Sequence, residues 1–66
     1  MNLLVNGEPT SCAEGTTVRE LVERIAGGER GVAVSIDREV VPRSSWASTA
    51  LHSGALVEVL VAAAGG

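Results

Sequence analysis

The sequence contains no lysine, phenylalanine or tyrosine, and it has only one tryptophan. Its eight acidic residues outnumber its five arginines, so the formal net charge is −3 and no run of basic side chains occurs. Proteins that bind nucleic acids gather positive charge and often stack bases on aromatic rings. The composition therefore argues against a nucleic-acid partner, and the lack of lysine removes every side-chain amine that could form an isopeptide bond or a Schiff base.

Cysteine and histidine are equally scarce, with one of each in the chain. A lone cysteine, Cys12, excludes an internal disulfide and any site with several cysteine ligands. We expect a packed core thiol, because Ser11 and Ala13 beside it supply no cation to stabilise a thiolate. His52 has no second candidate ligand nearby in sequence, so no metal site is predicted. No set of residues suggests a nucleophile, base and orienting group, so we expect neither catalytic residues nor a bound cofactor.

The chain also lacks long apolar runs. None approaches the ~20 residues that cross a membrane, and the first residues have neither the basic start nor the long apolar core of a signal peptide. We therefore expect a cytoplasmic protein without membrane contact. At 66 residues, of which 45% are apolar, it should form one small domain that is better suited to binding than to enclosing a substrate.

Hydrophobic periodicity predicts the elements of this domain. Residues 1–6 alternate as a half-buried strand, and Asn6-Gly7 predicts a tight hairpin turn into a second strand over 10–13, entered at Pro9. Further strands are expected at 32–36, 39–41 and 56–61.

One helix is expected between the second and third strands. It begins at a capping box made by Thr17 and Glu20 and ends at Gly27-Gly28. Its apolar stripe consists of Val18, Leu21, Val22 and Ile25.

The order of elements predicts an α+β fold, because a single helix must cover one face of a mixed sheet. Pairing the last strand in parallel with the first gives the β-grasp, or ubiquitin-like, roll with four to five strands. The domain spans residues 1–61, and residues 62–66 form a flexible tail. Between 43 and 50 runs an irregular crossover, where Trp46 either covers the edge of the core or contacts a partner; its large area favours the core.

Leucines converge on the face of the sheet that the helix leaves bare. Leu4 points there from the first strand, and Leu56 and Leu60 point there from the last strand, around Glu58. Because an apolar patch on an open sheet face usually marks a binding surface in a soluble protein, we predict that these four residues form a partner-binding patch.

The tail ends in Gly65-Gly66, a pair that contributes little to a fold. It is therefore either an ordinary frayed end or a segment narrow enough to enter a slot in a partner and present its carboxylate there.

Several stretches together resemble the ThiS family, the sulfur carrier proteins of thiamine biosynthesis. They are residues 1–8, residues 15–18, residues 41–44 with Trp46, and the final Gly65-Gly66. The resemblance covers the whole chain and implies a β-grasp carrier rather than an enzyme. Its C-terminal carboxylate would be activated with ATP by an E1-like adenylyltransferase. A sulfur-donor protein would then help convert it to a thiocarboxylate, which donates sulfur to thiazole synthase.

By this resemblance, Gly66 carries the adenylate and then the sulfur, while Gly65 and Ala64 thread into the partner. The ATP is used by the partner, not held by this chain. The chain departs from the family in having Asp37-Arg38 where an Asn-Gly turn is common, and Ala62-Ala63-Ala64 where a glutamine often precedes the glycines. Alternatives are a carrier for molybdopterin or cysteine synthesis, a protein-conjugating modifier, or a non-covalent β-grasp binding module.

Overall fold

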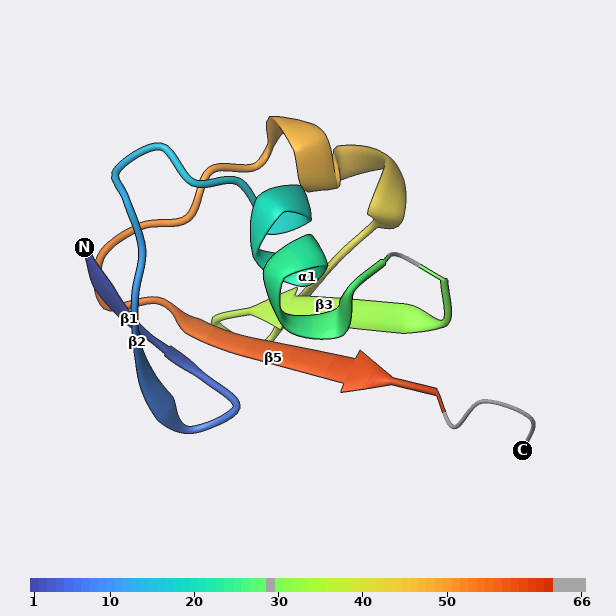
Figure 1. The fold of residues 1–66 in the computed structure, drawn as a ribbon, viewed down its shortest axis with the longest axis horizontal. Helices are drawn as coiled ribbons and strands as arrows, with labels where there is room; N and C mark the ends of the chain where they lie inside the picture. Colours follow the sequence, from blue (N-terminus) through green and yellow to red (C-terminus); the bar gives the residue numbers. More distant parts are fainter. Residues whose placement is uncertain (29, 63–66) are drawn as a thin grey trace.

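The computed structural model describes residues 1–28 and 30–62, which form a five-stranded mixed sheet with one α-helix and one 3-10 helix (Figure 1). The strand order is β2-β1-β5-β3-β4; β1 and β5 run parallel, and the other neighbours are antiparallel. This is the predicted β-grasp arrangement, with the last strand beside the first. The elements are β1 (Asn2–Val5), β2 (Glu8–Ser11), α1 (Val18–Ala26), β3 (Val32–Ile36), β4 (Glu39–Val41), η1 (Arg43–Ser48) and β5 (Leu56–Val61).

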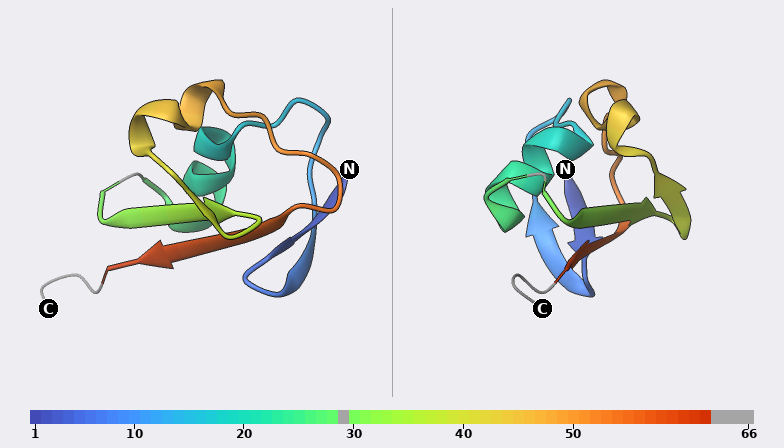
Figure 2. Two further views of the ribbon diagram at one scale, coloured as in Figure 1. Left: turned by 180° about the vertical axis from the view of Figure 1, so that it is seen from behind. Right: turned by 90° about the vertical axis from the view of Figure 1, so that its right-hand side faces the viewer.

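Both helices lie on the same side of the sheet, which leaves the other side bare (Figure 2). In the described ranges, no helix combines the length and the apolar character needed to cross a lipid bilayer.

The second strand differs from its predicted position. The sequence predicts a strand over 10–13 entered at Pro9, whereas β2 begins at Glu8, directly after the Asn6-Gly7 turn, and ends at Ser11. Pro9 lies inside the strand, opposite Leu4. This is tolerated because β2 is an edge strand, where a missing N–H can face away from the sheet.

The chain beyond β2 still pairs with the start of the protein. The Cys12 N–H donates to the Met1 carbonyl at 2.9 Å, and the Met1 amino group donates to the Cys12 carbonyl at 2.7 Å.

Helix α1 begins and ends where the sequence predicts. The Thr17 N–H donates to Glu20 Oε1 at 2.9 Å, the Glu20 N–H donates to Thr17 Oγ1 at 3.2 Å, and Gly27 ends the helix in the left-handed conformation. Ile25, the last residue of the predicted apolar stripe, is covered less than the other three: its side chain is 43% exposed. It lies with Arg24 at the margin of the sheet, beside the β1–β2 hairpin, where no element covers it fully.

Apolar side chains from the sheet, α1 and the crossover form the core. Trp46 is 1% exposed, and its Nε1–H donates to the Val41 carbonyl at 2.9 Å. The tryptophan therefore belongs to the core itself, and a role as a partner contact is excluded by its burial. The largest fully buried side chains are Trp46, Leu21, Val18, Val22, Val34 and Val57.

Candidate functional site

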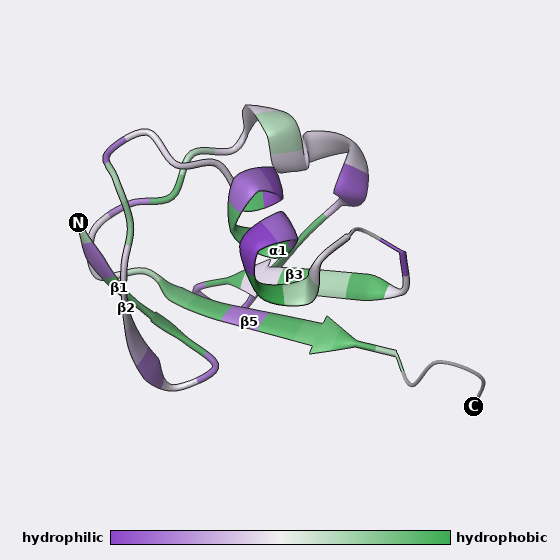
Figure 3. Ribbon diagram, viewed as in Figure 1, coloured by the Kyte–Doolittle hydropathy of each residue, from purple (hydrophilic) through white to green (hydrophobic). Residues whose placement is uncertain are grey.

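Strand β5 supplies both the core and the bare face of the sheet. Val57 and Val59 are buried beneath the helices, and Leu56, Glu58 and Leu60 alternate with them and are exposed on the opposite side. Figure 3 shows β5 as hydrophobic except for one hydrophilic band, and Glu58 is the one charged residue of the strand. The face that carries these three side chains is thus apolar around a single carboxylate.

Two neighbouring strands extend this face. Leu4 of β1 lies opposite Leu56 in the parallel pair and is 37% exposed. On the other side, Val40 of β4 pairs with Ser35, which in turn pairs with Glu58, so Val40 shares the same face. We call this surface the open face; it consists of Leu4, Val40, Leu56, Glu58 and Leu60.

The structure therefore places all four residues of the predicted patch together. Their role in partner binding stays a prediction. Val40 was not predicted, although it is 77% exposed, more than any other exposed large apolar side chain. The two-residue turn before β4 fixes the register of that strand, so counting forward from the turn would have placed Val40 opposite Ser35 and on this face.

Glu58 lies between two shallow depressions of the open face and lines both of them. One lies between Leu56 and the β1–β2 turn, and the other between Val40 and Leu60. Ser35 Oγ donates a long hydrogen bond of 3.4 Å to Glu58 Oε1.

The Asn6 side chain holds β5 from one flank. Beyond Val5, β1 turns away from β5, and the Asn6 amide takes the place of the next strand residue. Its Nδ2 donates to the Val59 carbonyl at 3.1 Å, and its Oδ1 accepts from the Val59 N–H at 2.9 Å. The sequence identified Asn6 only as a turn residue, which it also is, with φ of 51°.

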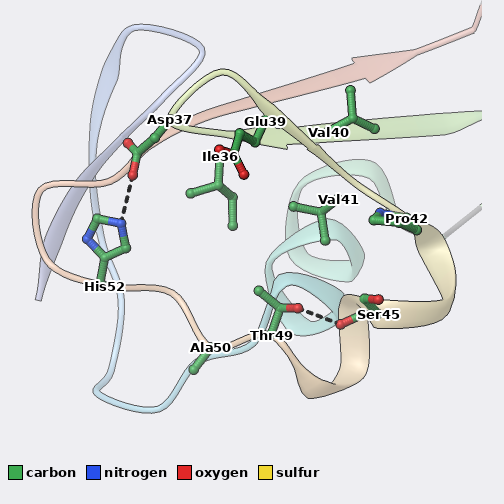
Figure 4. Close-up of a pocket in the computed structure, with 10 residues that line it drawn as sticks. All are labelled: Ile36, Asp37, Glu39, Val40, Val41, Pro42, Ser45, Thr49, Ala50 and His52. Atoms are coloured by element: carbon green, nitrogen blue, oxygen red, sulfur yellow. Dashed lines mark hydrogen bonds and ion pairs between the residues drawn. The ribbon is translucent and has the colours of Figure 1, made fainter.

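Asp37 holds the beginning of β5 from the other flank. Its N–H donates to the Leu56 carbonyl at 2.8 Å, and its Oδ1 accepts from the Leu56 N–H at 3.0 Å. Its Oδ2 lies 2.9 Å from Nε2 of His52 (Figure 4). Asp37 and Arg38, the two residues between β3 and β4, adopt the left-handed conformation with φ of 50° and 72°. Both central residues of such a hairpin turn require positive φ.

The sequence showed no partner for His52, but in the structure its side chain contacts Asp37. Its Nδ1 lies 3.0 Å from the Ser53 carbonyl, so both ring nitrogens face acceptors, an arrangement that the doubly protonated ring satisfies. The Ser53 carbonyl and then Asp37 raise the pKa of His52 above its ordinary value. The Leu56 N–H and then His52 lower the pKa of Asp37. In residues 1–28 and 30–62, no three His, Cys, Asp or Glu side chains come together as metal ligands.

The Cys12 thiol is buried, as predicted, but the reasoning about its surroundings was incomplete. Arg24 Nη1 lies 3.7 Å from the sulfur and donates to the Ser11 carbonyl at 3.1 Å. The sequence neighbours of Cys12 could not show this cation, because it comes from α1.

Strand β5 points away from the N-terminus, and Ala62 follows at its end (Figure 1). The Ala62 N–H donates to the Gly31 carbonyl at 2.7 Å, one residue beyond the predicted boundary of the domain. The predicted functional residues Ala64, Gly65 and Gly66 lie outside the described residues.

Comparisons with known proteins agree on one family. The model of the ThiS family matches residues 3–66. The sulfur carrier protein ThiS of Escherichia coli (strain K12) is 35% identical over 66 residues, which cover both chains completely. A protein of Paramagnetospirillum magneticum named thiazole synthase is 35% identical over the same length, and this chain corresponds to 20% of it.

Solved structures give the same result. The crystal structure of the thiamine biosynthesis protein ThiS from Geobacter metallireducens is 35% identical, covers both chains completely and superposes with a TM-score of 0.81. A solution structure of a thiamine biosynthesis protein from the same organism is 34% identical, with a TM-score of 0.80 over all of this chain and 88% of the other. This chain therefore belongs to the ThiS family, the sulfur carrier proteins of thiamine biosynthesis, and it is a β-grasp carrier rather than an enzyme.

Proposed function

We propose that the carboxylate of Gly66 is the reactive group of this carrier. An E1-like adenylyltransferase would join it to AMP from ATP, because a free carboxylate is a poor electrophile and AMP is a good leaving group. Hydrosulfide (HS⁻) supplied by a donor protein then attacks the carbonyl carbon and expels AMP; loss of the S–H proton leaves the thiocarboxylate, which passes its sulfur to thiazole synthase. The catalytic groups lie on these partners.

The observation that carries this proposal is that one strand joins the open face to the tail. Leu56, Glu58 and Leu60 are exposed on β5, and Ala62 follows at its end. A partner that docks on the open face therefore receives the tail in a fixed direction.

The tail itself suits a narrow slot. If residues 62–66 are extended at roughly 3.3 Å per residue, they reach about 16 Å beyond the sheet. Gly65 and Gly66 have no Cβ that would crowd a slot or the path of a nucleophile toward the carbonyl, and Ala64 adds only a methyl group.

Thiazole synthase as a partner is supported by the Paramagnetospirillum magneticum relative. There, a segment similar to this whole chain forms a fifth of a protein named thiazole synthase. A domain and its partner that function together are often joined in one chain, so we propose that thiazole synthase is a partner of this carrier. Because adenylation consumes ATP, we also propose the cytoplasm as the place where it acts.

Intact-mass analysis tests the reactive group. After incubation with ATP, the adenylyltransferase and the sulfur donor, the protein should gain the mass difference between one sulfur and one oxygen atom. A variant that lacks Gly66 is the matched control: it should unfold at nearly the same urea concentration as the full chain and gain no mass. An unchanged mass for the full chain in the complete mixture would refute the proposal.

A further inference from the structure

Glu58 is the charged group at the centre of the otherwise apolar open face. Leu56 and Leu60 flank it along β5, and Leu4 and Val40 extend the apolar surface on either side. Within residues 1–28 and 30–62, the one side-chain hydrogen bond of its carboxylate is the 3.4 Å contact with Ser35 Oγ. In the free protein, water hydrates the rest of the carboxylate.

Docking changes this situation. A partner that covers the leucines must also remove water from Glu58, because the carboxylate lines both depressions of the open face. Burying an ionised carboxylate is costly unless a cation and hydrogen-bond donors replace the water. The long bond from Ser35 supplies only one donor and no charge.

We propose that the surface of thiazole synthase that docks here is apolar and carries one arginine or lysine positioned opposite Glu58. This inference rests on the proposed function and adds the chemistry by which the partner is recognised. An arginine suits the site best, since its planar guanidinium can donate two parallel hydrogen bonds to one carboxylate. Glu58 then selects against apolar surfaces that lack such a cation, because they would leave its charge buried and unpaired.

Among the described residues, Arg38 is a cation that lies beside this site. Arg38, in the β3–β4 turn, lines the same depression as Leu56 and Glu58. Among residues 1–28 and 30–62, Arg38 forms no ion pair with Glu58. If Arg38 moved onto Glu58 during docking, the partner would need no cation, so the experiment must separate these two sources.

Titration calorimetry with purified thiazole synthase tests the inference. The result that decides is whether substitutions at Glu58 weaken or strengthen the affinity. Glu58→Leu removes the charge and enlarges the apolar surface. If the partner presents a cation, this variant and the isosteric Glu58→Gln should both bind more weakly, by roughly thirtyfold or more. If the partner presents no cation, both variants should bind as tightly as the wild type or more tightly, which would overturn the inference.

Two controls complete the experiment. Glu39→Gln removes the same charge from β4, and Glu39 pairs with the half-buried Ile36, away from the open face; its affinity should match that of the wild type. Arg38→Gln should also leave the affinity nearly unchanged. If Arg38→Gln weakens binding as much as Glu58→Gln, and the double variant adds nothing, the cation is internal and the inference is wrong.

The binding result at Glu58 can be interpreted independently of whether the proposed carrier function is correct. Sulfur loading of the wild-type chain, read by intact mass, tests the carrier chemistry independently of Glu58. If the wild type gains sulfur but Glu58→Leu binds thiazole synthase more tightly, only the cation is refuted. Circular dichroism and urea unfolding of each variant show that affinity differences come from folded protein.

Discussion

The bridge between Asn6 and β5 can be tested by removing the side chain without disturbing the turn. Asn6 forms two hydrogen bonds with the Val59 backbone, at 2.9 and 3.1 Å, in a partly buried position. Replacement by glycine keeps a residue that tolerates φ of 51° and deletes the two bonds, and it also adds backbone freedom to the unfolded chain. The free energy of unfolding of Asn6→Gly therefore reports the bridge together with this smaller entropic cost.

The expected loss follows from the number of bonds. A typical hydrogen bond contributes about 0.5–1.5 kcal/mol net, so deleting two should cost roughly 1–3 kcal/mol. Asn6→Ala should cost about 1–2 kcal/mol more than Asn6→Gly, because alanine is strained in the left-handed conformation. In a domain of this size, each kcal/mol lowers the thermal midpoint by about 4–8 °C.

Urea unfolding followed by circular dichroism measures both variants. Asn6→Asp is a graded control: its carboxylate can still accept from the Val59 N–H, but it can no longer donate to the Val59 carbonyl. We expect its stability to lie below that of the wild type. If Asn6→Gly unfolds within about 0.5 kcal/mol of the wild type, the amide does not act as a substitute for a strand residue, and the account of how β5 is held is wrong.

Three further perturbations have definite expected outcomes. The Asp37–His52 pair should stabilise the fold most between about pH 4 and 6.5. Folding raises the pKa of His52 above 6.5, so the stability that His52 contributes is lost as the pH rises through the raised value. Folding lowers the pKa of Asp37 below 3.8, so the stability that Asp37 contributes is lost only as the pH falls through the lowered value. Urea unfolding of His52→Gln should therefore differ from that of the wild type more at pH 6 than at pH 9, and an equal difference at both would contradict the pairing. Leu60→Asp should change the urea midpoint little, because Leu60 is 67% exposed, yet weaken thiazole synthase binding in calorimetry; the reverse result would place Leu60 in the core. Leu21→Ala should cost about 2–5 kcal/mol of unfolding free energy, since Leu21 is fully buried in α1, and a loss below about 1 kcal/mol would mean that the helix packs loosely.

The elements that could be predicted are those specified by neighbouring residues. The Thr17–Glu20 capping box marks the beginning of α1 and Gly27 marks its end. Each signal involves only residues close together in the chain, and both ends are confirmed. The Asn6-Gly7 turn is likewise local. The error in β2 arose because Pro9 was treated as the start of a strand, although the pairing that a two-residue turn imposes begins at once, at Glu8.

The contacts that could not be predicted join segments far apart in the chain. Asn6 and Val59 are separated by 53 residues, and Asp37 and His52 by 15. Neither pair shows any local pattern. They depend on the sheet register, which becomes known only when β1, β3 and β5 are placed side by side. The leucines of the open face could be predicted because alternation along a strand needs no such information.

These long-range contacts hold the carrier's last strand at three points. Asp37 binds the backbone at Leu56, Asn6 binds it at Val59, and the Gly31 carbonyl binds it at Ala62. All three partners lie in turns or loops. A tail that must enter a partner's slot gains affinity when its starting point and direction are already fixed, because less conformational freedom is lost on binding. We therefore propose that the small domain contributes to the chemistry at its end by holding β5 in place, and that the open face on the same strand selects the partner that receives the tail.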